Sequence, residues 1–183
     1  MLYEAGIIES VSSAVSTLKP NCRIVVDPVM IATSGTPLID EAAINALKSL
    51  LLPLADLITP NLDEAEAFLG NSIRTFADTE EAARALSKKF NTAVLLKGGH
   101  LSGRELVDTL SLPGKDSITF KQKRIDNINT HGSGCTLSAA IAAWIARGHG
   151  LEESVSRGHD YVRTAMENPL KIKGVHYINH FPR

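Results

Sequence analysis

The pattern with the clearest chemical potential is a glycine-containing turn directly before an apolar helix. The segment THGSGC (130–135) precedes a run rich in Ala and Ile. Glycines let the backbone bend sharply, and the free N–H groups at the start of the following helix add positive potential. The pattern therefore indicates an anion site suited to phosphate, formed by Gly132, Ser133 and Gly134. A plain glycine turn would have the same spacing, so the residues alone leave both interpretations open.

Cys135 is the residue of this segment that could take part directly in a reaction. It would begin the apolar helix, where the helix dipole favours a negative charge such as a thiolate. A thiolate at that place could accept a proton from a substrate hydroxyl. The alternative is that Cys135 is a small packing residue.

Asn61 and Glu64 form a second candidate site. They are three residues apart at a predicted helix start, which places them on one face. An amide and a carboxylate facing a phosphate pocket would suit a hydrated Mg²⁺. The same spacing is that of a capping box, in which the two side chains only satisfy backbone N–H groups. The spacing by itself favours the capping box.

Three further charged residues lie at or near predicted strand ends. Asp27 ends the run RIVVD (23–27), a position at which a carboxylate often serves a ligand. Lys97 stands before a pair of glycines and could meet a nucleotide phosphate as a point charge. Asp108 could face the site or be the polar residue of an alternating strand. The plainer alternatives are a turn acid for Asp27 and a solvated cation for Lys97.

Hydrophobic periodicity predicts the elements that must position these residues. The predicted helices cover 5–19, 40–51, 62–69, 79–90, 134–147 and 152–167. The predicted strands cover 23–27, 55–59 and 92–97, and a hairpin covers 104–111 with 117–124. Short apolar strands that alternate with helices predict an α/β fold with a parallel sheet, in which ligands bind at the carboxyl ends of the strands.

Composition predicts one globular domain over residues 1–183. Lys and Arg number 19 against 20 Asp and Glu, so the formal net charge of −1 argues against a nucleic-acid or membrane partner. Two cysteines are too few for a disulfide framework and favour a reducing, cytoplasmic setting. The chain opens on a helix and has only three parallel strands, so we expect that further strands once preceded it.

Five segments taken together resemble the hydroxymethylpyrimidine/phosphomethylpyrimidine kinases, which are thiamine-biosynthesis enzymes of the ribokinase-like fold. In chain order the segments are DPVMIATSGTPLI (27–39), LLPLADLITPNLDEAEAFLG (51–70), LLKGGHL (95–101), VDTL (107–110) and THGSGCTLSAAIAA (130–143). The resemblance implies a three-layer sandwich with a mostly parallel central sheet. It also implies an N-terminal truncation, because the family's pyrimidine-binding N-terminal stretch has no counterpart. The tail GVHYINHF (174–181) departs from the family's usual ending.

The resemblance also implies an activity and roles for individual residues. The activity is ATP- and Mg²⁺-dependent phosphorylation of the pyrimidine's hydroxymethyl group, followed by phosphorylation of the resulting monophosphate. The implied roles are base for Cys135, anion hole for Gly132, Ser133 and Gly134, magnesium site for Asp27, Asn61 and Glu64, nucleotide contacts for Lys97, Asp108 and Thr130, and pyrimidine contact for Met1. The expected partners are the pyrimidine, ATP and a second copy in a homodimer, or a fused module such as a thiamine-phosphate synthase.

Other functions stay open on the sequence. One is a different ribokinase-like kinase, for a pyridoxine- or pyridoxal-type substrate or a sugar; the sugar is disfavoured because sugar kinases of this fold carry Asp where Cys135 stands. Another is a catalytically impaired fragment that binds nucleotide without turnover.

Overall fold

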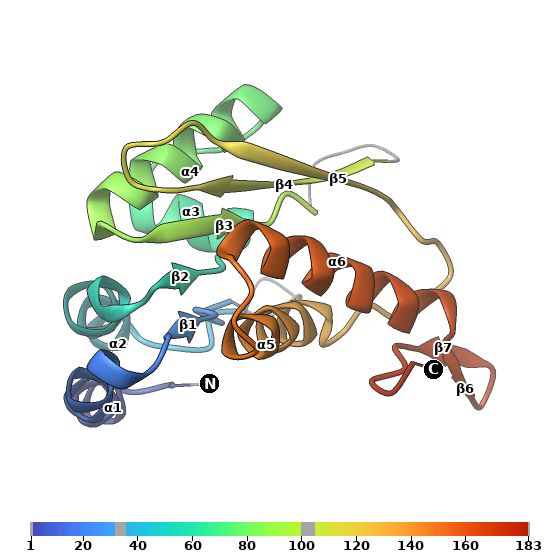
Figure 1. Ribbon diagram of the computed structural model, residues 1–183, viewed down its shortest axis with the longest axis horizontal. Coiled ribbons are helices and arrows are strands. Elements are labelled where there is room, and N and C mark those ends of the chain that lie inside the picture. The colour runs from blue at the N-terminus through green and yellow to red at the C-terminus, as the bar shows by residue number, and fades with distance from the viewer. Residues whose placement is uncertain (1, 32–35, 100–104, 183) are drawn as a thin grey trace. The chain divides into compact units, whose positions relative to one another are not determined.

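A computed structural model describes residues 2–31, 36–99 and 105–182 (Figure 1). The chain divides into two compact units, Met1–Gln122 and Lys123–Arg183, and each is described here by itself. That the two units form a single domain remains a prediction from the sequence.

The first unit is built on a five-stranded sheet in the order β1-β2-β3-β4-β5. The strands are β1 (Val25–Val26), β2 (Leu57–Ile58), β3 (Ala93–Leu96), β4 (Glu105–Ser111) and β5 (Ile118–Lys123). The first three strands run parallel, and β4 pairs antiparallel with β3. The predicted α/β class, the three parallel strands and the adjacent β4 and β5 are therefore confirmed.

One hydrophobic core joins this sheet to the helices of the same unit. The helices are α1 (Ala5–Leu18), α2 (Glu41–Ala46), α3 (Leu62–Leu69) and α4 (Phe76–Phe90), with short turns η1 (Lys19–Asn21), η2 (Leu47–Leu51) and η3 (Leu52–Leu54). Ile58, Val94 and Leu96 face this core from the sheet. Leu57 and Leu95 point to the opposite face and are also fully buried, as expected for parallel strands.

Two helices differ from the periodicity-based prediction. The helix expected from Thr79 begins at Phe76, because the Thr75 hydroxyl accepts from the Asp78 N–H and the Asp78 carboxylate accepts from the Thr75 N–H. This capping box fixes the start three residues earlier than expected. The helix expected over 40–51 is regular only to Ala46 and continues as one π-helical turn, although Asp40 caps its start as predicted.

The second unit consists of two helices and a small hairpin. Its elements are α5 (Ser133–Ala146), α6 (Leu151–Glu167), β6 (Leu170–Ile172) and β7 (Val175–Tyr177). Both helices were predicted within about one residue, whereas the hairpin formed by β6 and β7 was not predicted. Its two strands have only three residues each and no buried side chain, and an alternation that short does not predict a strand.

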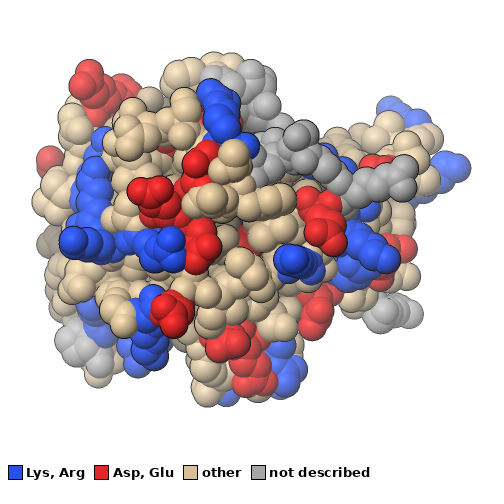
Figure 2. Space-filling view, turned by 90° about the horizontal axis from the view of Figure 1, so that it is seen from above, with Lys and Arg blue, Asp and Glu red and all other residues tan. Residues whose placement is uncertain are grey.

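The surface carries both signs of charge. Figure 2 shows Lys and Arg side chains interspersed with Asp and Glu on the face that it displays. Within the described part of the chain, no helix is both long enough and apolar enough to span a membrane.

Close packing between β3 and β4 makes a specific demand on Gly98. A Cβ placed on Gly98 would overlap the carbonyl oxygen of Val107, whereas a Cβ on Gly99 would meet open space. We expect Gly98→Ala to lower the free energy of unfolding by about 3 kcal/mol, because either β4 or the turn must move. Gly99→Ala is the matched control and should cost less than about 1 kcal/mol. Urea unfolding of the two variants measures the difference, and equal costs would contradict the close approach.

Candidate functional site

The carboxyl ends of β1, β2 and β3 bring together residues that are far apart in the sequence. Lys97 follows β3, and its Nζ lies 2.9 Å from Oδ1 of Asp27, which follows β1. The backbone of Lys97 also pairs with Asn61, which follows β2, through its N–H to the Pro60 carbonyl at 2.9 Å. The side chains of Lys97 and Asp27 are only 16% and 12% exposed. The predicted strand-end positions are confirmed for these three residues, and the structure shows that they lie close together.

Asp108 supports the turn that follows Lys97. Its Oδ1 accepts a hydrogen bond of 2.9 Å from the Gly98 N–H. Of the two possibilities left open by the sequence, this contact favours a side chain that faces the strand ends. Asp108 therefore orients the glycine turn, and a contact with nucleotide stays a prediction.

Glu64 joins two loops at the same edge of the sheet. Its side chain is 1% exposed. One carboxylate oxygen accepts from the Met30 N–H at 3.0 Å, and the other accepts from the Asn61 N–H at 2.9 Å. The Asn61 Oδ1 in turn accepts from the Glu64 N–H at 2.8 Å, which completes the capping box. The capping box, which the spacing of Asn61 and Glu64 favoured, is therefore confirmed. Glu64 also accepts the bond from Met30, which was not predicted.

The loop that Glu64 holds contains a strained residue. Val29 has a φ of 45°, a left-handed conformation that is rare for a β-branched side chain. Such strain persists only where neighbouring contacts fix the backbone. Here the fixing contacts lie on both sides of Val29, at the Asp27 carboxylate and the Met30 N–H.

Burial raises the pKa of the Glu64 carboxyl above its ordinary value of 4.5. The hydrogen bond from Asn61, the positive charge of Lys97 and the hydrogen bond from Met30 act in the opposite direction, while the Asp27 charge adds to the rise. The net effect is that the folded protein holds this proton to a higher pH than the unfolded chain does.

The residues fit Mg²⁺ only in part. Asp27 offers a carboxylate with some exposure, which suits an ion that binds one or two carboxylates and keeps several waters. Glu64 is enclosed and both of its oxygens already accept N–H groups, so the geometry does not favour it as a direct ligand. Within the described part of the chain, three or more His, Cys, Asp or Glu side chains nowhere converge in the manner of a metal cluster.

The glycine turn lies in the second unit, at the start of α5. Gly132 adopts φ 88°, ψ −3°, a left-handed conformation that favours glycine, and it caps the helix without any side-chain hydrogen bond. The Ser133 N–H bonds to the Thr130 carbonyl at 3.0 Å, and the Thr136 N–H bonds to the Gly132 carbonyl at 2.9 Å. Helix geometry leaves the N–H groups of Gly134 and Cys135 without an intrahelical acceptor. The first turn contains no acidic residue, so it suits an anion.

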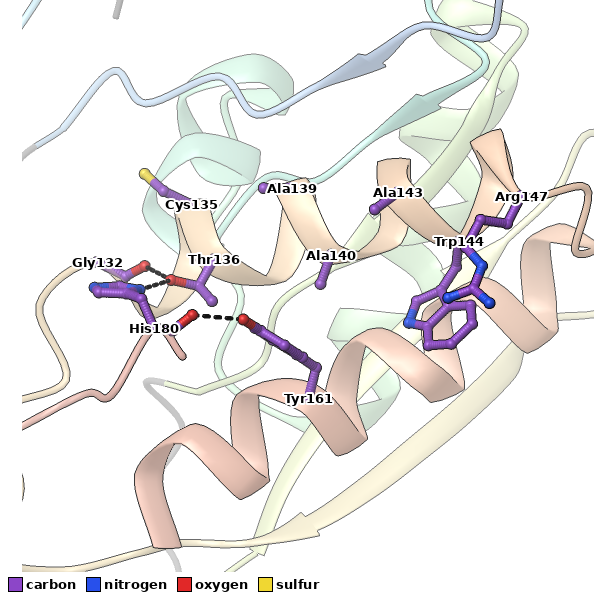
Figure 3. Close-up of a pocket in the computed structure, with 10 residues that line it drawn as sticks. All are labelled: Gly132, Cys135, Thr136, Ala139, Ala140, Ala143, Trp144, Arg147, Tyr161 and His180. Atoms are coloured by element: carbon purple, nitrogen blue, oxygen red, sulfur yellow. Dashed lines mark hydrogen bonds between the residues drawn. The ribbon is translucent and has the colours of Figure 1, made fainter. Parts of the chain in front are cut away.

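A pocket of about 610 Å³ runs from this turn along α5 (Figure 3). Its lining residues are Gly132, Cys135, Thr136, Ala139, Ala140, Ala143, Trp144, Arg147, Tyr161 and His180. Cys135 is an exposed free thiol at one end. At the opposite end, the Arg147 guanidinium lies 4.6 Å from the Trp144 ring, and Arg157 lies at the same distance from that ring.

The residues that other elements contribute to this pocket were not predicted from the sequence. Small residues recur along α5 at helical spacing, and this was a usable signal for a groove. Tyr161 comes from α6 and His180 from the tail, and nothing in their local sequence places them beside Gly132. Met1, expected at a pyrimidine pocket, lies outside the described residues.

The ion pair between Lys97 and Asp27 is open to a double-mutant test. We expect Lys97→Met to lower the free energy of unfolding by about 2 kcal/mol, because it removes the charge that neutralises a largely buried carboxylate. The Lys97→Met/Asp27→Asn double variant should lose less than the sum of the two single variants. Urea unfolding measures all four proteins, and strict additivity would show that the pair contributes no coupling.

Glu64→Gln tests the buried carboxylate. Because the folded-state pKa is raised, the stability of wild type relative to the variant should be greatest below pH 4.5 and should fall as pH rises through the folded-state value. The variant also leaves one of two backbone N–H groups without an acceptor, a cost of about 1–3 kcal/mol. Urea unfolding across this pH range measures both effects. Asp63→Asn removes the charge of an exposed neighbour and is the control. If the free energy of unfolding of that variant depends on pH in the same way as that of Glu64→Gln, burial of Glu64 is not the cause of the pH dependence.

The sequence of the chain matches a known protein family. A model of the family "Phosphomethylpyrimidine kinase" matches residues 1–180. The hydroxymethylpyrimidine/phosphomethylpyrimidine kinase of Haemophilus influenzae is 42% identical over 175 residues, which is 94% of this chain and 65% of that protein. The thiamine biosynthesis bifunctional protein ThiED of Geobacter sulfurreducens is 40% identical over 98% of this chain and 36% of its own length. The chain thus spans less than two thirds of either relative.

Solved structures agree on the fold. The Bacillus subtilis pyridoxal kinase, solved as an ADP complex, matches with a TM-score of 0.86 at 30% identity over 100% of this chain and 67% of its own. The expected ribokinase-like α/β fold is confirmed by this match and by the mostly parallel sheet. The family that the sequence motifs indicated is the one that the whole chain matches: this protein belongs to the phosphomethylpyrimidine kinase family.

Proposed function

We propose that this chain supplies the phosphate-handling part of an ATP-dependent kinase that phosphorylates hydroxymethylpyrimidine and its monophosphate. The proposal rests on the family match and on the relatives named as kinases for this substrate. The observation that supports it most directly is the left-handed Gly132 turn, with the exposed thiol of Cys135 at the same helix start.

The proposed chemistry is an in-line transfer of the γ-phosphoryl group of ATP to the substrate hydroxyl. The hydroxyl oxygen forms the new bond to phosphorus, its proton passes to the Cys135 thiolate to give the thiol, and ADP leaves with the bridging oxygen. The N–H groups of Gly134 and Cys135 would stabilise the negative charge on the transferring group, which is the main catalytic contribution in this class of reaction. Thr130 and Ser133 would hold the turn in shape through their backbone hydrogen bond.

The first unit has its own predicted roles toward the nucleotide. Lys97 would offer a point charge to phosphate, and Asp108 would keep the turn after it in place. Asp27 would be the protein oxygen for Mg²⁺, while Glu64 and Asn61 would act by fixing the loops around it. Mg²⁺, when bound, neutralises triphosphate charge.

A pyridoxal-type substrate is the second candidate. The observation that favours it is the TM-score of 0.86 with the Bacillus subtilis pyridoxal kinase, which covers 100% of this chain. A substrate panel with ATP separates the two candidates. Nucleotide binding without turnover on any alcohol would instead favour a catalytically impaired fragment, and the chain covers 65% of the Haemophilus influenzae kinase.

The proposal also covers the cellular compartment and the partners of the protein. The relative from Geobacter sulfurreducens is named as a bifunctional protein, which supports the expectation of a fused partner module. Both cysteines are free thiols, in keeping with a reducing, cytoplasmic setting. A homodimer stays a prediction that sedimentation or size-exclusion measurements would test.

The two cysteines provide a matched pair of variants. We expect Cys135→Ala to lower the turnover number for hydroxymethylpyrimidine about 100-fold, the usual contribution of a positioned base, with little change in ATP affinity. Cys22→Ala removes the other exposed thiol and should leave turnover unchanged. Coupled detection of ADP with both pyrimidine substrates measures the effect.

Two results would contradict this assignment. Equal turnover in Cys135→Ala and wild type would remove the role of base from Cys135. A parallel loss in Cys22→Ala would indicate that thiol removal disturbs the protein in general.

A further inference from the structure

We propose that the C-terminal segment 175–181 is a strap that fixes the glycine turn, with His180 as the positioning residue. The segment belongs to the tail that departs from the family's usual ending. The proposal deepens the proposed function, since it rests on the glycine turn being the phosphate site.

The strap is hydrogen-bonded to the segment just before the turn and to helix α6. The Asn129 N–H, just before the turn, donates to the His176 carbonyl at 2.8 Å, and Asn129 pairs with Tyr177 in a parallel bridge. Two residues later, the Asn179 N–H donates to the Ala165 carbonyl of α6 at 3.0 Å. Ile178 between them is only 4% exposed. The tail is therefore packed against the body of its unit and not merely adjacent to it.

These hydrogen bonds place His180 beside the turn. The Tyr161 hydroxyl on α6 donates to the His180 carbonyl at 2.6 Å. The His180 Nδ1 lies 3.2 Å from the Thr136 Oγ1, and the Thr136 hydroxyl donates to the Gly132 carbonyl at 2.8 Å (Figure 3). Because the Thr136 hydroxyl proton is directed at the Gly132 carbonyl, we assign the tautomer in which His180 donates through Nδ1–H. The result is a chain of hydrogen bonds from α6 to the left-handed glycine.

This chain of hydrogen bonds acts on the peptide unit directly before the Gly134 and Cys135 N–H groups that would meet phosphate. The Gly132 carbonyl belongs to the same planar peptide unit as the Ser133 N–H, so a fixed carbonyl fixes that unit. Two bonds from Thr136, one from its N–H and one from its hydroxyl, end on this carbonyl. The His131 N–H is held separately by the Asn129 Oδ1 at 2.9 Å. His180 thus orders the turn before a ligand arrives, which reduces the cost of ordering it on binding.

Amide hydrogen exchange over residues 132–136 tests the strap independently of kinase activity. We expect His180→Ala to speed exchange there about fivefold, the effect of losing one net hydrogen bond, and to weaken AMP-PCP binding by a similar factor. His180→Asn places an amide N–H near the position of Nδ1 and should restore both values. Phe181→Ala is the matched control, since its side chain is 87% exposed beside His180, and it should behave as wild type.

The outcomes separate the two proposals. Unchanged exchange in His180→Ala, or His180→Asn as impaired as His180→Ala, would overturn the positioning role. If wild type binds no AMP-PCP, the proposed function fails while the exchange measurement still decides the strap. If His180→Ala does not fold, Tyr161→Phe removes only the bond to the His180 carbonyl; faster exchange over 132–136 in that variant supports the strap, and unchanged exchange overturns it.

Discussion

The buried carboxylate of Glu64 is the constraint on which the first unit's site depends. A carboxyl group enclosed in an apolar core is costly unless its oxygens find donors. Here the donors are the backbone N–H groups of Met30 and Asn61, which come from loops after two different strands. One side chain therefore closes the α3 helix start and also holds the strained loop at Val29. The ion pair of Lys97 with Asp27 lies at the same strand ends and lowers the cost of burying charge there.

The second unit reaches a similar end by different means. Its phosphate-type turn contains no Asp, Glu, Lys or Arg, and its positive potential comes from backbone N–H groups at the start of α5. Such groups are useful only if the backbone keeps its shape, and Gly132 has little intrinsic preference for one shape. Hydrogen bonds from Thr136, and behind it His180, supply the missing rigidity. In both units the backbone that would contact substrate is ordered by a side chain that would not contact it. This side chain is Glu64 in the first unit and His180 in the second.

Elements that are fixed by local interactions were predicted well, and elements that depend on contacts between distant residues were not. Helix α3 was predicted residue for residue, because its capping residue, its apolar face and its terminal glycine are all local signals. Helix α4 was misplaced at its start, since Thr75 and Asp78 form a capping box that the apolar pattern hides. The β6–β7 hairpin was missed because its strands have only three residues each, too few for an alternating pattern to predict a strand. At the site, the strand-end positions of Asp27, Asn61 and Lys97 followed from topology alone.

The sequence by itself determined the α/β class, the family and the set of residues with reactive or charged groups. These depend on patterns that are short in sequence: alternating apolar runs, glycine turns and motifs in a fixed order. Only the tertiary structure decided what each polar group does, because a carboxylate or an imidazole has several possible partners until packing removes most of them. In the folded protein Glu64 accepts hydrogen bonds from two loops, and Asp108 accepts one from Gly98. His180 lies beside Gly132.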